Sequence, residues 1–243
     1  MKIVAVIPSR YGSTRFPGKP LAEICGIPLI QRVYENCMKS GAVDAVVVAT
    51  DDQRIADAVS GFGGRFMMTG EENRSGSDRA AETGRKLGLS DEDIIVNVQG
   101  DQPLVHPDCI RDVIQPLLED RTLDMSTLVF KIVDEREITD PKDVKTVFDN
   151  NGMALYFSRA TIPFPRDPGT KCDFYKHLGV YAYSMKFLES FCKLPEGILE
   201  NIEKLEQLRA IEYGYKIKTV ITEHDSPEVD LPEDIVRIEK ILS

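Results

Sequence analysis

The sequence predicts an α/β protein built on one doubly wound, mostly parallel sheet. Apolar runs of strand length alternate with segments whose apolar residues recur every three or four positions, the spacing of an amphipathic helix. Strands separated by helices of this length pair in parallel through right-handed crossovers. Residues 1–243 are therefore expected to form a single domain, in which 124–243 add strands to the sheet begun by 1–123.

The first half of the chain carries the regular alternation. Four apolar runs predict strands at 2–7, 45–49, 65–68 and 94–98. The helices expected between and after them are carried by 29–37, by the segment capped at Asp51 and Asp52, by 78–87 and by the segment that Pro107 opens.

The second half changes character, because several strands follow one another with short connections. The runs of strand character are 124–133, 144–148, 153–157, 178–183 and 216–222. Asn151-Gly152 predicts a hairpin turn between the second and third of them. Helical periods are found at 186–192, 199–213 and 232–242, and Gly214 is placed to end the second.

Composition excludes several classes of protein. The net charge of −10 argues against a sequence-independent grip on nucleic acid. No apolar stretch approaches the roughly 20 residues of a membrane helix, and no signal peptide is evident at the start. The five cysteines are widely spaced without a CxxC pair, which is typical of reduced thiols. We expect a cytoplasmic protein that acts on a small molecule.

The loop after the first strand concentrates positive charge. Residues 8–20 hold Arg10, Arg15 and Lys19 together with glycines that let the backbone approach an anion. The loop matches neither the GxxxxGK[ST] nor the GxGxxG pattern. Ligands bind outside the carboxyl ends of strands in doubly wound sheets, so 8–20, 50–53 and 99–103 are expected to converge on one crevice.

A family resemblance is carried by this loop and by motifs along nearly the whole chain. The segment IPSRYGSTRFPGKPL resembles the amino-terminal signature of the sugar-activating cytidylyltransferases, in particular the 3-deoxy-manno-octulosonate (Kdo) cytidylyltransferases. The motifs that follow in that family's order are VATDD, RSGSDRAAE, IVNVQGDQPL, ALYFSRATIPF, KHLGVYAY, EKLEQLRAIEYG and VDLPEDI.

The resemblance implies a reaction and an architecture. It implies Mg²⁺-dependent transfer of CMP from CTP to the anomeric hydroxyl of Kdo, with release of pyrophosphate, for lipopolysaccharide biosynthesis. The implied fold is that of the nucleotide-diphospho-sugar transferases, and the implied assembly is a homodimer. Residues 1–123 would then be the nucleotide-binding half, and 124–243 would supply the sugar-binding and dimerisation elements.

The same resemblance assigns residues to CTP and to the metal. Arg10, Ser13, Arg15 and Lys19 would hold the triphosphate, with Lys19 also counted as catalytic. Ser75 and Arg79 would border the cytosine, although a helix-capping turn explains RSGSDR equally well.

Two aspartates are the implied Mg²⁺ ligands and complete the catalytic set. Asp101 follows a buried strand in VQGD, and Asp230 precedes the last helix in VDLPEDI. Carboxylate oxygens are suitable ligands for Mg²⁺. A single carboxylate binds the ion only weakly, so a second one is expected. Asp230 could also simply cap the final helix.

The sugar pocket is implied by polar residues of the second half and one of the first. The candidates are Gln99, Arg159, His177, Tyr181, Glu206 and Gln207. Arg159 is the cation expected to meet the carboxylate of Kdo. His177 could instead be an ordinary strand-edge histidine, and Glu206 and Gln207 could face solvent.

Two departures from the family pattern leave alternatives open. Gln102 stands where glutamate is expected in GDEP, and the segment 166–174 is short. Gln102 puts a supporting role of position 102 in metal binding in doubt, and the short segment could alter the sugar pocket, so the sugar could be an 8-amino variant of Kdo. A related enzyme that activates a sialic acid is another alternative, because both sugars are 2-keto-3-deoxy acids. A nucleotide-binding protein without catalysis is the remaining alternative, against which the retention of Asp101 and Asp230 argues.

Overall fold

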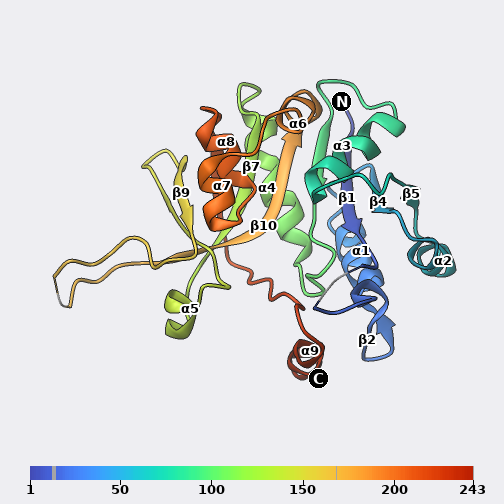
Figure 1. The fold of residues 1–243 in the computed structure, drawn as a ribbon, viewed down its shortest axis with the longest axis horizontal. Helices are drawn as coiled ribbons and strands as arrows, with labels where there is room; N and C mark the ends of the chain where they lie inside the picture. Colours follow the sequence, from blue (N-terminus) through green and yellow to red (C-terminus); the bar gives the residue numbers. More distant parts are fainter. Residues whose placement is uncertain (13–14, 168, 243) are drawn as a thin grey trace.

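A nine-stranded mixed sheet includes strands from both halves of the sequence in the computed structural model, which describes residues 1–12, 15–167 and 169–242 (Figure 1). Its main path, in spatial order, is β11 (Ile217–Thr222), β7 (Met125–Lys131), β10 (Tyr175–Ser184), β6 (Ile94–Asn97), β1 (Ile3–Ser9), β4 (Ala45–Thr50) and β5 (Phe66–Met68). Neighbours along this path are parallel except where β10 runs antiparallel to β6 and β7. The predicted mostly parallel α/β sheet is confirmed.

Short antiparallel strands complete the nine-stranded sheet, and a further pair forms a small sheet of its own. The strand β8 (Lys145–Phe148) pairs with β10 and with β9 (Ala154–Ser158). The Asn151-Gly152 turn predicted between β8 and β9 is confirmed, with Gly152 at a φ of 74°. A separate hairpin, which the sequence did not predict, is formed by β2 (Glu23–Ile24) and β3 (Ile27–Pro28).

Helices cover both faces of the sheet. The first face carries α1 (Leu29–Lys39), α2 (Gln53–Gly61), α4 (Pro107–Glu119) and α9 (Pro232–Leu242). The second face carries α3 (Gly76–Lys86), α6 (Met185–Phe191), α7 (Ile198–Glu203) and α8 (Gln207–Glu212). Because strand residues alternate between faces, Ala5 and Ile7 enter the first core while Val4 and Val6 enter the second.

One predicted helix is wrong. The single helix expected over 199–213 is two helices, α7 and α8, and Lys204 between them takes a left-handed backbone with φ 55°. A buried ion pair from Glu200 to Arg209 then holds the two helices together. Two further elements were not predicted, η1 (Lys19–Leu21) and α5 (Glu135–Thr139).

The chain positions its polar loops at one edge of the sheet. β1, β6 and β11 are parallel to one another, so the segments that follow them leave from the same edge. The backbone N–H of Val229 donates to the carbonyl of Asp101 at 2.9 Å, which joins the segment after β11 to the segment after β6.

Residues 159–167 and 169–174, between β9 and β10, extend away from the sheet (Figure 1). Within the described part of the chain, none of the helices has the length and apolarity that crossing a membrane requires.

Candidate active site

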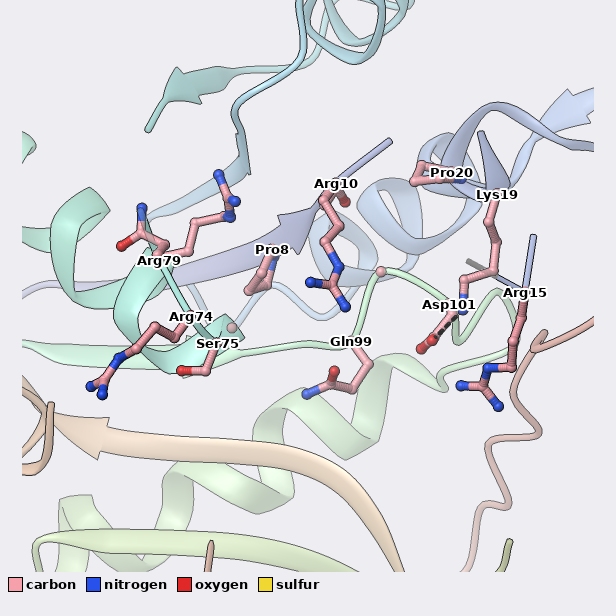
Figure 2. Close-up of a pocket in the computed structure, with 14 residues that line it drawn as sticks. Pro8, Arg10, Arg15, Lys19, Pro20, Arg74, Ser75, Arg79, Gln99 and Asp101 are labelled. Atoms are coloured by element: carbon pink, nitrogen blue, oxygen red, sulfur yellow. Dashed lines mark hydrogen bonds and ion pairs between the residues drawn. The ribbon is translucent and has the colours of Figure 1, made fainter. Parts of the chain in front are cut away.

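The segments that follow β1 and β6 and the start of α3 enclose a cavity of about 280 Å³, here called the cationic cavity (Figure 2). Five basic side chains line it, and Asp101 is the one acid among the described lining residues. The lining residues are Pro8, Ser9, Arg10, Arg15, Lys19, Pro20, Asn73, Arg74, Ser75, Gly76, Arg79, Gln99, Gly100 and Asp101. Such a lining suits a polyanion, even in a protein of net negative charge.

The residues predicted to bind CTP converge on this cavity. Figure 2 shows Arg10, Arg15 and Lys19 reaching toward the strand-end segment that carries Gln99 and Asp101. Ser75 and Arg79 line the same cavity from the beginning of α3. Ser13 lies outside the described residues.

Ser75 and Arg79 also have structural partners. Ser75 is the N-cap of α3, where its hydroxyl accepts from the backbone N–H of Asp78 at 3.2 Å. The Arg79 guanidinium donates to Asp51 at 2.6 Å and also to the Thr69 hydroxyl. The helix-capping turn is therefore present, and its residues line the cavity as well. Asp51 reaches the site through Arg79, whereas residues 50–53 do not themselves line the cavity.

Asn73 and Arg74 were missed by the sequence analysis although they line the cavity beside Ser75. The RSGSDR motif begins at Arg74, so its first residue was the available signal. That arginine adds positive charge at the side opposite Lys19 (Figure 2).

Asp101 and Asp230, far apart in the sequence, meet across Lys19. The Lys19 Nζ lies 2.7 Å from Asp101 Oδ2 and 3.9 Å from Asp230 Oδ1, and it donates to the Val229 carbonyl at 2.9 Å. Arg15 donates to Asp230 Oδ2 at 3.1 Å. Because both carboxylates lie within 4 Å of one ammonium nitrogen, a single cation can occupy the space between them.

These two carboxylates fit a divalent ion. Their side chains are 25% and 22% exposed, so both face the cleft without being fully solvated. Hard carboxylate oxygens with room for waters and ligand oxygens are the set that Mg²⁺ prefers. Asp101 and Asp230 are therefore the residues that would hold it.

Glu228 is an acid beside this pair that the sequence analysis missed; the residue as a whole is exposed, while its carboxyl group points into the polar lining next to Gln102. Burial, with the negative charges of Asp101 and Asp230, raises the pKa of Glu228 to about 8. The side-chain amide of Gln102 donates to Glu228 Oε1 at 3.2 Å and also to the Leu178 carbonyl. The amide of Gln102 can therefore donate a hydrogen bond to Glu228. A glutamate at position 102 would instead place a second negative charge beside Glu228 and repel it.

A second cavity of about 260 Å³, here called the polar cavity, adjoins the first. Gly76, Gln99 and Asp101 line both cavities. Five of the six residues predicted to bind the sugar line the polar cavity: Gln99, His177, Tyr181, Glu206 and Gln207. Asp101 thus stands at the junction of the two cavities.

Two buried polar atoms of the polar cavity lack a hydrogen-bond partner among the described residues, Glu206 Oε1 and Gln207 Nε2. The Glu206 carboxylate is nevertheless held on other sides, because its Oε2 accepts from Ser77 at 2.7 Å and its Oε1 lies 3.8 Å from the Arg209 guanidinium. Burial raises the pKa of Glu206. Buried polar atoms in a folded protein are normally paired, so these two groups indicate a polar ligand.

His177 is held as a neutral ring. The imidazole Nε2 lies 2.9 Å from Thr127 Oγ1, and the ring packs at 5.1 Å from that of Phe157 and at 5.2 Å from that of Tyr181. Burial lowers the pKa of His177 to about 3. The ring can therefore orient a hydroxyl by hydrogen bonding but does not contribute positive charge to the cavity.

Arg159 lies apart from both cavities. Its guanidinium donates to the Glu203 carbonyl at 2.8 Å and to the Pro141 carbonyl at 2.9 Å. Its role toward a substrate carboxylate stays a prediction. Lys204, in the break between α7 and α8, is the basic residue among the described lining of the polar cavity. The sequence analysis missed Lys204 because it predicted one continuous helix over 199–213, in which this residue has no special position.

Comparisons with known proteins agree with this geometry. The cytidylyltransferase family profile matches residues 4–217. A 3-deoxy-manno-octulosonate cytidylyltransferase of Desulfatibacillum aliphaticivorans is 64% identical over 100% of this chain and 99% of its own. An 8-amino-3,8-dideoxy-manno-octulosonate cytidylyltransferase of Shewanella halifaxensis is 55% identical over 97% of this chain and 96% of its own.

A solved structure extends the likeness to three dimensions. A CMP:2-keto-3-deoxy-manno-octonic acid synthetase complexed with CTP superimposes with a TM-score of 0.93 at 40% identity, covering 100% of this chain and 98% of that one. The chain therefore belongs to the cytidylyltransferase family and groups within it with the 3-deoxy-manno-octulosonate cytidylyltransferases.

Proposed function

We propose that this chain transfers CMP from CTP to the anomeric hydroxyl of Kdo and releases pyrophosphate. The observation that carries the proposal is the pair of adjoining cavities, one cationic and one polar, with Asp101 at their junction. A triphosphate in the first and a polyhydroxylated sugar in the second would bring the α-phosphorus and the hydroxyl together there. Placing the two reactants in line is the larger part of catalysis in such transfers.

The bonding change is simple. The sugar hydroxyl oxygen bonds to the α-phosphorus, its proton passes to solvent water, and the bond from that phosphorus to the bridging oxygen of pyrophosphate breaks. Arg10, Arg15 and Lys19 would stabilise the charge that grows on the leaving pyrophosphate. Arg74 would add to this charge, and Ser75 and Arg79 would border the base.

Asp101 and Asp230 would hold Mg²⁺ in the working enzyme. When bound, the ion neutralises triphosphate charge and favours ionisation of the attacking hydroxyl. Lys19 and Arg15, which pair with these carboxylates here, would turn to phosphate oxygens. Glu228 lies beside these two carboxylates, whose negative charges help to raise its pKa, and a bound cation would offset that like-charge repulsion.

The polar cavity would bind Kdo through polar side-chain atoms that face it, two of which lack a hydrogen-bond partner in the part of the chain that the structure describes. Glu206 and Gln207 would pair with sugar hydroxyls, and neutral His177 would orient another. Lys204 is our candidate for the substrate carboxylate, alongside Arg159, which would first have to leave its carbonyl partners.

A second candidate substrate is 8-amino-Kdo. Glu206 and Glu228 place carboxyl groups in the polar cavity that could accept a substrate ammonium. Relatives named for that sugar reach 55% identity. Kdo remains the first candidate because relatives named for it reach 64%.

The wider setting forms part of the proposal. CMP-Kdo would be made in the cytoplasm for lipopolysaccharide biosynthesis by a homodimer of this chain. The extended residues 159–167, which leave the sheet, are available for a subunit contact (Figure 1).

The test is pyrophosphate release with CTP and Mg²⁺, using Kdo, 8-amino-Kdo and a sialic acid in parallel. Asp101→Asn and Asp230→Asn are expected to lower kcat by at least about 100-fold, because each removes a charge that acts on the transition state. Asp91→Asn, an exposed aspartate just before β6, is the matched control and should keep full activity. CTP binding without turnover on any of the three sugars would contradict the proposal.

A further inference from the structure

His106, Asp108 and His224 bring three metal-ligating side chains together outside both cavities. His106 is the N-cap of α4, Asp108 lies in the first turn of that helix, and His224 follows the end of β11. One ligand atom from each lies within 4.8 Å of the other two. Two of the chain's three histidines therefore meet an aspartate, although they are far apart in the sequence.

The distances suit a tetrahedral ion. His106 Nδ1 lies 3.5 Å and His224 Nε2 lies 3.6 Å from the same atom, Asp108 Oδ2. In a tetrahedral zinc site, with metal–ligand bonds near 2.1 Å, neighbouring ligand atoms are about 3.4 Å apart. The aspartate oxygen is thus already at a suitable distance from both nitrogens.

The imidazoles need one adjustment. Their rings are stacked, with centroids 3.6 Å apart and planes at 18°, so their nitrogen lone pairs lie in nearly parallel planes. Both side chains are partly exposed, at 44% and 35%, and can turn toward a common ion. An ion on His106 Nδ1 would replace the long 3.3 Å contact with the Asp108 backbone N–H.

Neighbouring groups prepare Asp108 for this role. Arg111 donates to Asp108 Oδ1, which fixes the carboxylate and leaves Oδ2 facing the two rings. Hydrogen bonds from outer groups orient the ligands of metal sites in this way. Asp112 is a second carboxylate in electrostatic reach of Asp108 and His224. With neutral imidazoles, Asp108, Arg111 and Asp112 together leave one net negative charge, which favours a cation.

We propose that His106, Asp108 and His224 form a binding site for a divalent transition ion of the Zn²⁺ class, with water completing the coordination. Imidazole nitrogen selects Zn²⁺, Ni²⁺ or Cu²⁺ over Mg²⁺, which prefers oxygen, so the site is distinct from the Asp101–Asp230 pair. The ion would tie the segment after β11 to the start of α4. That segment continues to Glu228 and Asp230, so the tie would stabilise the chain that carries one wall of the active site.

The test titrates Zn²⁺ into the metal-stripped full chain in excess Mg²⁺, which keeps the carboxylate pair occupied. One equivalent of Zn²⁺ should bind and raise the Tm by several degrees. Co²⁺ in its place should give the intense visible absorption of a tetrahedral site. His224→Gln should weaken binding more than about 10-fold, because it removes a ligand.

Two further variants make the result specific. His106→Ser removes the imidazole but keeps a good N-cap for α4, so lost binding there reflects the ligand and not the helix. His177→Gln, which changes the third histidine, should still bind one equivalent of Zn²⁺. CMP transfer in Mg²⁺ should be unchanged in the His106 and His224 variants. The proposal is overturned if wild type shows no Zn²⁺ binding at about 100 μM, or if binding survives unweakened in both variants.

Discussion

Lys204 owes its position to a single backbone conformation. Its φ of 55° ends α7 and turns the chain into α8, and this turn places the residue on the wall of the polar cavity. With the residues that the structure describes, its ammonium makes one long hydrogen bond, 3.4 Å from Asn201 Oδ1. A cation so weakly engaged is free to pair with an incoming carboxylate.

Lys204→Ala is therefore expected to raise KM for Kdo about 10-fold, as loss of one charged hydrogen bond would. KM for CTP should stay unchanged, because Lys204 does not line the cationic cavity. Steady-state kinetics with each substrate varied in turn measures both values. Arg159→Ala is the companion variant. If KM for Kdo rises in this variant and not in Lys204→Ala, Arg159 and not Lys204 contacts the substrate carboxylate.

His177 links the polar cavity to the pH dependence of folding. Its pKa is lowered to about 3 by burial, against about 6.5 in the unfolded chain. A depressed pKa means that the unfolded chain binds the proton more tightly, so stability is complete above pH 6.5 and falls as the pH drops toward 3.

We expect wild type to lose about 1–2 kcal/mol of unfolding free energy relative to His177→Gln between pH 6.5 and pH 5, slightly less than the full linkage because the ring borders the cavity. Urea unfolding of both proteins at the two pH values provides the measurement. A constant difference between them would show that His177 remains titratable in the folded protein.

At the scale of elements, the end of β1 and the segment after β6 lie so close together that there is no space for a side chain at Gly100. A Cβ there would lie 2.8 Å from Ser9 Oγ and 2.9 Å from the Pro8 carbonyl oxygen. The Pro8 carbonyl is part of the backbone and cannot move aside as a flexible side chain can. The end of β1 and the segment after β6 would therefore have to separate. Asp101 is the next residue and would move with them.

Gly100→Ala should thus lower stability by about 1–3 kcal/mol and lower kcat as well. For a chain of this size the corresponding fall in Tm is about 2–4 °C per kcal/mol. Gly61→Ala is the matched control, because a Cβ at that position would meet nothing within 4 Å and alanine favours the helix. Equal melting temperatures for the Gly100 variant and wild type would show that the two segments can separate without loss of stability.

At the scale of the whole molecule, local and overall charge have opposite signs. The chain carries a net charge of −10, yet five basic side chains line the cationic cavity. Charges beyond about 10 Å are screened at 0.1 M salt, so the cavity lining should dominate what CTP experiences.

KM for CTP is accordingly expected to rise several-fold between about 50 and 500 mM KCl at fixed Mg²⁺. If the net charge dominated, added salt would screen repulsion and KM would fall. Initial rates over a CTP range decide the sign, and an unchanged kcat at saturating CTP excludes general inactivation by salt.

Much of the fold followed from local patterns in the sequence. The strands β1, β4 and β6 are buried on both faces, and such strands read as continuous apolar runs. The hairpin at Asn151-Gly152 was equally plain, because few residues other than these adopt its backbone. The α7–α8 break escaped prediction because Lys204 has no special propensity for a left-handed conformation, and the tertiary ion pair between Glu200 and Arg209 joins the two helices.

The residues of the candidate site also fall into those that the sequence predicted and those that only the structure revealed. The sequence alone determined the sheet, the cationic loop and, through its motifs, the family and most of the lining of both cavities, because these depend on residue type and spacing. Only the tertiary structure brought Asp101 to Asp230, turned Arg159 toward backbone carbonyls and placed Glu228 and Lys204 in the polar cavity. Such contacts join residues distant in the chain, and no local preference encodes which distant partner a side chain will meet.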